Sequence, residues 1–146
     1  MSKIYVASSW RNERQPEVVA LLRECGHEVY DFRNPKEGDK GFHWSEIDPN
    51  WKNWTPEEYI EALDHPIAEA GYKSDFDAML WAEVFVGVMP FGRSASLEMG
   101  WAAGQNRPTY LLLSDGEPEL MVKMLYDIIP DMDTLRAYAL AWADPH

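Results

Sequence analysis

Glu98 is the residue whose type and surroundings most directly suggest chemistry. It follows Ser94 and Ser96 and precedes Gly100, where the turn residues of the stretch 89–104 change into a helical pattern. A carboxylate held rigidly beside a small polar loop can act as a nucleophile or as a base. An exposed acid near a helix start can also simply complement the helix dipole, which contributes well under ~1 kcal/mol. From the local sequence alone, the two interpretations are equally favoured.

Asp75 is a second acid that could move a proton. One residue separates it from Asp77 on a predicted helix, so the two carboxylates point to different faces. Asp75 shares its face with Tyr72 and Met79, and a carboxyl group on a partly apolar face can keep its proton and donate it. The spacing by itself favours two ordinary solvated acids.

Arg93, Ser94 and Ser96 stand at the predicted start of a helix. Backbone N–H groups, two hydroxyls and a guanidinium in this arrangement can bind an anion. Serine is also a common helix cap, so the signal is weak. Ser8 and Ser9, at the end of the first predicted strand, could add donors to the same anion.

Metal and cofactor chemistry find little support in the sequence. His43, Glu46 and Asp48 match no known metal-site spacing. Cys25 is the single cysteine, which excludes an internal disulfide and fits a reducing compartment. The stretch after the first predicted strand lacks the glycines of a dinucleotide fingerprint. We therefore expect no metal and no cofactor.

The composition narrows the classes of partner. Lys and Arg number 13 against 25 Asp and Glu, so the formal net charge is −12. A surface for nucleic acid or for a membrane needs positive charge, so we expect neither, although a few local groups could still hold a small anion. The N-terminal residues lack the apolar run of a signal peptide, and no stretch approaches the roughly 18 apolar residues of a membrane span. We expect a cytoplasmic protein.

Strand and helix patterns alternate along the 146 residues. This alternation indicates an α/β protein whose parallel sheet is covered by helices on both faces. No repeat or domain boundary is evident, so we expect one domain. Thr55 and Glu58 form a capping-box pattern that predicts a helix start. The predicted strands are 3–7, 27–32, 84–89 and 109–113. The predicted helices begin at Pro16, after Thr55, at about Ile67 and after Arg93. Two closing helices are predicted over 117–129 and 133–142.

The segment 33–54 has no clear period. A structureless loop of this length is uncommon in a compact domain unless it is functional or disordered, and Phe42, Trp44, Trp51 and Trp54 argue against disorder. The loop could close over a site and exclude water, or it could form an oligomer interface, where Trp is favoured. We give these two hypotheses equal weight.

The alternating pattern also predicts where a ligand would bind. In parallel sheets of this kind, ligands lie beyond the carboxyl ends of the strands. The first three predicted strands end at residues 8–11, 31–33 and 91–94. We expect these segments and Glu98 to converge on one edge of the sheet.

Three stretches of the chain resemble one known family. These stretches, "KIYVASSW", "YKSDFDAMLWAEVFVGVM" and "SASLEMGWAAGQNRPTYLLL", together resemble the nucleoside 2-deoxyribosyltransferase-like family, including its nucleotide N-glycosidase branch. The Glu-x-Gly segment in the third stretch is the most specific feature, and the likeness covers most of the chain except the Trp-rich loop. The resemblance implies a flavodoxin/Rossmann-like three-layer sandwich with a mainly parallel sheet of about four to five strands. It implies a single domain at 1–146 with a Trp-rich insertion at about 33–55.

The same resemblance implies cleavage or transfer at an N-glycosidic bond. Glu98 matches the family's nucleophilic glutamate, and Asp75, in "YKSD", matches an aspartate that contacts the base and helps it leave. Breaking such a bond builds positive charge on the sugar, which a fixed carboxylate stabilises or bonds to. Tyr5, or the turn at Ser8 and Ser9, lies where the family places contacts to the sugar or phosphate.

Aromatic side chains and one departure from the family refine the expected ligand. Trp10, Phe32 or a tryptophan of the 33–54 loop could stack on a base. Gly92 and Arg93 stand where the family's transferases carry acids for base recognition. This departure argues against exchange on an uncharged nucleoside and favours an anionic ligand.

Two alternative functions stay open. The fold outline and the single glutamate also resemble TIR-like domains that hydrolyse NAD at its nicotinamide bond, and an NAD pyrophosphate would explain Arg93 and the serines. The third hypothesis is a non-enzymatic sensor or adaptor that binds a nucleotide ligand. In every case we expect a small nucleoside or nucleotide as the partner, and a homo-oligomer, either a dimer or a larger assembly.

Overall fold

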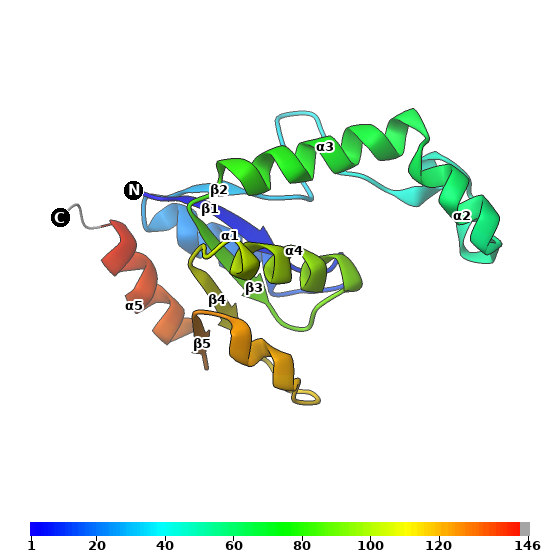
Figure 1. Ribbon diagram of the computed structural model, residues 1–146. Helices are drawn as coiled ribbons and strands as arrows, with labels where there is room; N and C mark the ends of the chain where they lie inside the picture. Colours follow the sequence, from blue (N-terminus) through cyan, green and yellow to red (C-terminus); the bar gives the residue numbers. More distant parts are fainter. Residues whose placement is uncertain (144–146) are drawn as a thin grey trace. The chain divides into compact units, whose positions relative to one another are not determined.

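The computed structural model describes residues 1–143, which form two compact units (Figure 1). The first unit, called the sheet unit below, comprises Met1–Asp31 and the chain from Trp81 onward. The second, called the aromatic unit, is Phe32–Leu80. Among the described residues, no helix has both the length and the apolar character needed to span a membrane.

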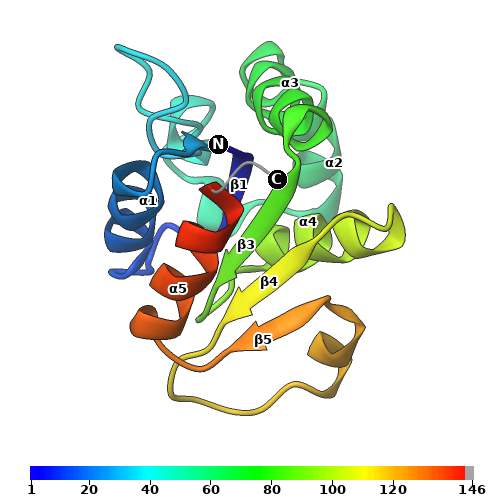
Figure 2. The same cartoon turned by 90° about the vertical axis from the view of Figure 1, so that its left-hand side faces the viewer.

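The sheet unit is built on five parallel strands (Figure 2). Their order across the sheet is β2-β1-β3-β4-β5, so the winding reverses between β1 and β3. This is the flavodoxin-like order, and it confirms the expected α/β class. The strands are β1 (Lys3–Ala7), β2 (Glu28–Tyr30), β3 (Val84–Val88), β4 (Thr109–Leu112) and β5 (Asp127–Ile129).

Helices cover both faces of this sheet (Figure 2). On one face, α1 (Gln15–Glu24) and α5 (Met132–Ala143) pack on an apolar core that includes Ile4 and Val6 of β1. On the other face, α4 (Arg93–Gly104) packs against β1, β3 and β4. Because side chains alternate along a strand, Tyr5 points away from the face that Ile4 and Val6 occupy.

The helix predicted over 117–129 is wrong. The structure has a short 3-10 helix, η3 (Leu120–Met124), followed by strand β5. Ile129 is fully buried in the core beneath α5, and its carbonyl accepts a hydrogen bond from the Leu113 backbone. The open edge of β4 pairs with this segment, and such tertiary pairing overrides local preference. The strand predicted over 27–32 is shorter than expected, and the other predicted strands and helices of the sheet unit are confirmed.

The aromatic unit contains α2 (Pro56–Leu63) and most of α3 (Pro66–Trp81) (Figure 1). It also contains two short 3-10 helices, η1 (Trp44–Glu46) and η2 (Trp51–Asn53). The predicted capping box is confirmed, since the Thr55 hydroxyl accepts from the Glu58 backbone and the Glu58 carboxylate accepts from the Thr55 backbone.

Aromatic rings hold the irregular part of this unit together. The Trp44 ring meets the rings of Phe42, Trp54 and Tyr59 edge-on, with centroids 4.7–5.8 Å apart. Phe42 also lies against α3 at Gly71, where an added Cβ would come within 2.9 Å of the Phe42 Cβ. The close approach of the loop to α3 therefore depends on glycine at this position.

Candidate functional site

Glu98 lies on α4 and contacts β1 through a hydrogen bond. The Tyr5 hydroxyl donates to Glu98 Oε2 at 2.6 Å, a length typical of a hydroxyl on a carboxylate. Tyr5 is only 1% exposed, whereas Glu98 is half-buried. Two residues 93 positions apart thus meet because β1 turns Tyr5 toward the face that α4 covers.

Neighbouring rings fix the Tyr5 side chain. Tyr30 of β2 stacks on it with the centroids 5.4 Å apart and the planes 13° from parallel, and Phe85 of β3 lies 5.5 Å away on the adjacent strand. The three rings come from three adjacent strands, β2, β1 and β3. A tyrosine packed in this way loses little further freedom when its hydroxyl orients a carboxylate, so the acid is preorganised.

The carboxyl ends of β1 and β3 meet at the reversal of the winding, which confirms the predicted convergence for these two strand ends. Ser8 is 7% exposed, and its hydroxyl donates to the Val88 carbonyl at 3.0 Å. Ser9 lies against Gly92, where an added Cβ would be 3.1 Å from the Ser9 Cβ. A side chain at residue 92 would press on Ser9, so glycine permits the two strand ends to approach. The Ser8 hydroxyl is used inside the fold, and its contact with a ligand stays a prediction.

The first turn of α4 presents polar groups to solvent. Arg93, Ser94 and Ser96 are exposed, and Gly92 at the cap position offers no side chain to the free backbone N–H groups. The Ser96 hydroxyl donates back to the Gly92 carbonyl at 3.4 Å. Within residues 1–143, no ion pair involves Arg93. A guanidinium beside a helix N-terminus can accept an anionic group.

Trp10 is the exposed aromatic residue of this region. It is 42% exposed in the loop that follows β1. A half-exposed indole at the carboxyl edge of a sheet offers a ring for a planar ligand to stack on. Its predicted role as a stacking partner is compatible with this placement and remains a prediction.

Asp75 and Phe32 belong to the aromatic unit. Asp75 is half-buried on α3, whereas Asp77 is exposed and pairs with Lys73 at 2.5 Å. Of the two acids, Asp77 is the solvated one and Asp75 sits in the more enclosed environment. Phe32 is half-buried at the start of the unit, with the Arg33 guanidinium 5.9 Å from its ring centroid.

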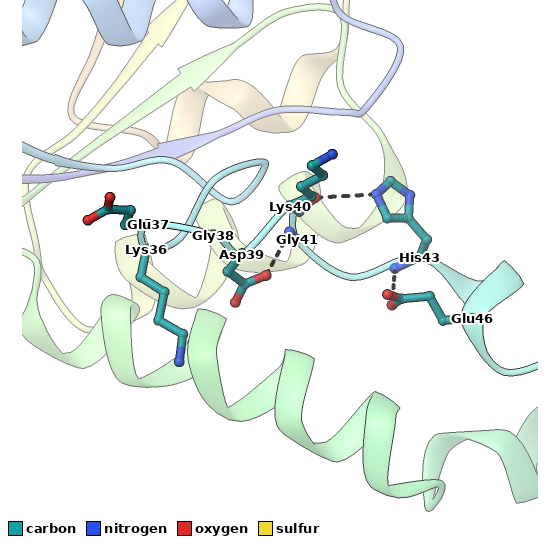
Figure 3. Close-up of a pocket in the computed structure, with 8 residues that line it drawn as sticks. All are labelled: Lys36, Glu37, Gly38, Asp39, Lys40, Gly41, His43 and Glu46. Carbon is teal, nitrogen blue, oxygen red and sulfur yellow. Dashed lines mark hydrogen bonds between the residues drawn. The ribbon is translucent and has the colours of Figure 1, made fainter.

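The loop at 36–46 surrounds an open hollow (Figure 3). Its polar groups bond largely within the loop: the Gly41 backbone donates to Asp39 at 2.9 Å, and the His43 backbone donates to Glu46 at 3.3 Å. The His43–Glu46 contact caps η1. The residues around the hollow are Lys36, Glu37, Gly38, Asp39, Lys40, Gly41, His43 and Glu46.

Asp48 has a structural partner near that loop. The Trp54 indole N–H donates to Asp48 Oδ2 at 2.8 Å, and the Asn50 backbone donates to its other oxygen at 2.9 Å. The Asn50 bond, followed by the Trp54 bond, holds the pKa of the Asp48 carboxyl below its usual value. His43, Glu46 and Asp48 therefore each support the local backbone or a tryptophan.

Asn12 is a buried residue that the sequence patterns did not single out. Its side chain lies between the ends of β1 and β3 and bonds to the Val88 carbonyl at 2.8 Å. The available signal was an asparagine in the turn before a predicted helix, where such side chains often bond to the backbone two residues on. Its long-range partners have no counterpart in the sequence pattern.

Comparison with known proteins yields structural matches only. No protein-family model matches the chain, and no curated protein sequence matches it either. The 2-deoxyribosyltransferase of the psychrotolerant bacterium Bacillus psychrosaccharolyticus superposes with a TM-score of 0.64 at 22% identity, over 97% of this chain and 96% of that one. The CMP N-glycosidase of Clostridium botulinum gives a TM-score of 0.50 at 16% identity, over 95% of this chain and 98% of that one.

These two proteins are a deoxyribosyltransferase and an N-glycosidase, which are the two activities of the family that the sequence motifs resemble. Both matches extend over nearly the whole of each chain. The fold implied by the resemblance is therefore confirmed. At these identities the likeness concerns the fold alone.

Proposed function

We propose that the chain cleaves or transfers the N-glycosidic bond of a nucleoside or nucleotide, with Glu98 as the nucleophile. The observation that carries this proposal is the Tyr5–Glu98 hydrogen bond beside the reversal of the sheet. The fold shared with a 2-deoxyribosyltransferase and a CMP N-glycosidase supports the same class of reaction. An acid that only complemented a helix dipole would need no buried tyrosine to orient it.

The proposed first step forms a covalent sugar–enzyme ester. A Glu98 carboxylate oxygen bonds to the anomeric carbon, the carbon–nitrogen bond breaks, and its electron pair leaves with the base. The positive charge that develops on the sugar ring faces the negative carboxylate, which lowers the barrier. In the second step, water or a second base displaces the carboxylate, and the reaction is then hydrolysis or transfer, respectively.

Tyr5 orients the nucleophile in this scheme. Its hydroxyl donates to Glu98 Oε2, so this carboxylate oxygen is held at a fixed place relative to β1. A charge-assisted bond of this kind is stronger than a neutral one and keeps the reacting oxygen in a defined position.

Asp75 is the proposed group that helps the base depart. A departing base gains an electron pair and needs a proton or a hydrogen bond. Asp75 is half-buried on α3, whereas Asp77 forms an exposed ion pair, so Asp75 is the acid of this helix to which we assign the role.

The ligand that we favour carries a phosphate. Arg93, Ser94 and Ser96 offer a guanidinium, two hydroxyls and the uncapped N–H groups of α4. An uncharged nucleoside would leave this cation and the helix N-terminus unused, whereas a phosphate would bond to both.

Incubation of the purified chain with nucleosides, 5′-mononucleotides and NAD, followed by chromatography, tests the proposal. Release of a free base, and its loss in a folded Glu98→Gln variant, is the expected result. Glutamine keeps the shape and the Tyr5 contact but is a poor nucleophile, so turnover should fall below detection while circular dichroism stays unchanged. Unchanged base release by folded Glu98→Gln would contradict the assignment of the nucleophile.

The same panel separates the alternative functions. Nicotinamide released from NAD alone would favour the TIR-like hydrolase, and ligand binding without any product would favour a sensor or adaptor. A transferase would differ from a hydrolase by forming a new nucleoside when a second free base is added.

A further inference from the structure

The Asn12 side chain joins the loop after β1 to the turn after β3. Asn12 is 2% exposed in the loop between β1 and α1. Its Nδ2 donates to the Val88 carbonyl at 2.8 Å and to the Pro90 carbonyl at 3.2 Å, while its Oδ1 accepts from the Arg14 backbone at 2.8 Å. The amide thus uses both its donor and its acceptor ends, and each end serves a different segment.

The two carbonyl partners belong to the turn that leads from β3 into α4. Val88 is the last residue of β3, and its carbonyl also accepts from the Ser8 hydroxyl. A buried carbonyl at a strand end needs a partner, and here the buried side chains of Ser8 and Asn12, both in the loop after β1, donate to it. These bonds from the loop after β1 therefore fix the direction in which the chain leaves β3.

This turn is directly connected to the proposed nucleophile. Helix α4 starts at Arg93, three residues after Pro90, and Glu98 lies in its second turn. The Tyr5–Glu98 bond joins the second turn of α4 to β1. The Asn12 bonds join the turn before α4 to the loop that follows β1. A hydrogen bond weakens steeply when its length or angle changes, so a shift of the turn would disturb both the carboxylate and the first turn of α4.

We infer that Asn12 is a positioning residue for the proposed reaction. It holds the β3–α4 turn so that Glu98 stays against Tyr5, and so that Gly92, just before α4, stays against Ser9. This inference rests on the proposed function, because positioning has a catalytic meaning only if Glu98 reacts. Asn12 itself touches no reacting atom in this scheme.

Asn12→Asp is the sharpest variant, because aspartate has the same size and keeps an acceptor for the Arg14 backbone. It removes the Nδ2 donor and turns a carboxylate oxygen toward the Val88 and Pro90 carbonyls. Ile129→Val is the matched control: Ile129 is fully buried on the α5 face of the sheet, so its truncation lowers stability without touching the turn. Asn12→Ser is a milder second variant in case aspartate prevents folding.

We expect Asn12→Asp to lower turnover much more than it changes substrate binding. For Asn12→Asp, kcat for base release should fall roughly tenfold to a hundredfold, as for a small misplacement of a reacting group, while KM stays within about threefold. Ile129→Val should lower Tm and leave kcat unchanged. If Asn12→Asp turns over like the wild type, or loses no more activity than a control of equal Tm, Asn12 is only a stabilising residue and the inference is wrong.

A second measurement separates this inference from the proposed function. Amide hydrogen exchange in the first two turns of α4 should accelerate in Asn12→Asp and Asn12→Ser relative to Ile129→Val. If the wild type releases no base from any substrate, the proposed function fails, while accelerated exchange still supports the positional role of Asn12. Unchanged exchange in α4 would overturn that role whatever the activity.

Discussion

At the scale of single residues, the proposed chemistry depends on which acids are enclosed by the fold and which are exposed to solvent. Tyr5 holds Glu98 by a 2.6 Å hydrogen bond, whereas Asp77 forms an exposed ion pair with Lys73. Asp75, two residues before Asp77, is half-buried on the same helix. The two aspartates therefore form a natural pair for comparison.

Asp75→Asn should slow departure of the base more than it weakens ligand binding. Asparagine keeps the size and can still form a hydrogen bond, but it cannot deliver a proton, and general acid catalysis typically contributes about 10²–10⁴-fold. Single-turnover rates and calorimetric affinities measure the two effects separately. Asp77→Asn is the matched control and should change neither. A lower affinity with an unchanged single-turnover rate would show that Asp75 binds the ligand without assisting departure.

Arg93→Ala should erase most of a preference for 5′-phosphorylated ligands. A charge-assisted contact to phosphate contributes on the order of 1.5–3 kcal/mol, or roughly tenfold to a hundredfold in affinity. Calorimetry on matched nucleoside and nucleotide pairs measures this preference, and nucleoside binding should not change. Arg136→Ala is the control, since Arg136 is an exposed arginine on α5 that contacts Glu24. Equal affinities for both ligands in the wild-type protein would remove the support for a phosphate site.

At the scale of elements, the capping box of α2 offers a clean test of local stability. Thr55→Ala removes the hydroxyl that accepts from the Glu58 backbone and should destabilise the helix by about 1 kcal/mol. Thr55→Ser keeps the hydroxyl and should stay close to the wild type. Urea unfolding followed by tryptophan fluorescence reports on this region, because Trp44 and Trp54 lie in the same unit. Equal unfolding midpoints for the Ala and Ser variants would mean that the hydroxyl does not stabilise α2.

At the scale of the whole molecule, stability should be constant near neutral pH and fall at both extremes. Hydrogen bonds from Tyr138 to Asp127 and from Thr134 to Asp131 hold the pKa of each carboxyl below its usual value, as bonds from Asn50 and Trp54 do for Asp48. A depressed folded-state pKa stabilises the fold above the unfolded value of about 3.9, and this contribution is lost as the pH falls through the lower folded value.

At alkaline pH, two tyrosines make the stability of the fold decrease as the pH rises. The hydrogen bond to Asp127 raises the pKa of Tyr138, and burial raises the pKa of Tyr110. These groups stabilise the fold below about pH 10, and the contribution is lost as the pH rises through their folded values. Urea midpoints measured against pH should therefore show a plateau with two falling limbs. Tyr138→Phe should flatten part of both limbs, and an unchanged profile in that variant would contradict the assignment.

Two expectations about the whole molecule stay predictions. One is the single domain over 1–146, and the other is the homo-oligomer. Apolar side chains are exposed on α2 (Tyr59, Ile60 and Leu63) and on η3 (Leu120, Met121 and Met124), as is common where proteins meet a partner.

The sequence by itself determined the local architecture. Apolar spacing predicted strands β1, β3 and β4 and helices α1, α3, α4 and α5, because periodicity and caps act over a few neighbouring residues. The Thr55–Glu58 cap was predicted for the same reason. Glu98 could be singled out as a candidate because a lone acid among small residues is visible in the sequence.

Only the tertiary structure decided which distant groups meet. It placed the Tyr5 hydroxyl on Glu98, the Asn12 amide on the Val88 carbonyl, and 127–129 as a strand beside β4 where a helix was predicted. These outcomes depend on the order of the strands and on which face each side chain takes, and both follow from packing of the whole sheet. Local preference is weak compared with burying Ile129 and satisfying the edge of β4, so the sequence pattern at 117–129 could not reveal the fifth strand.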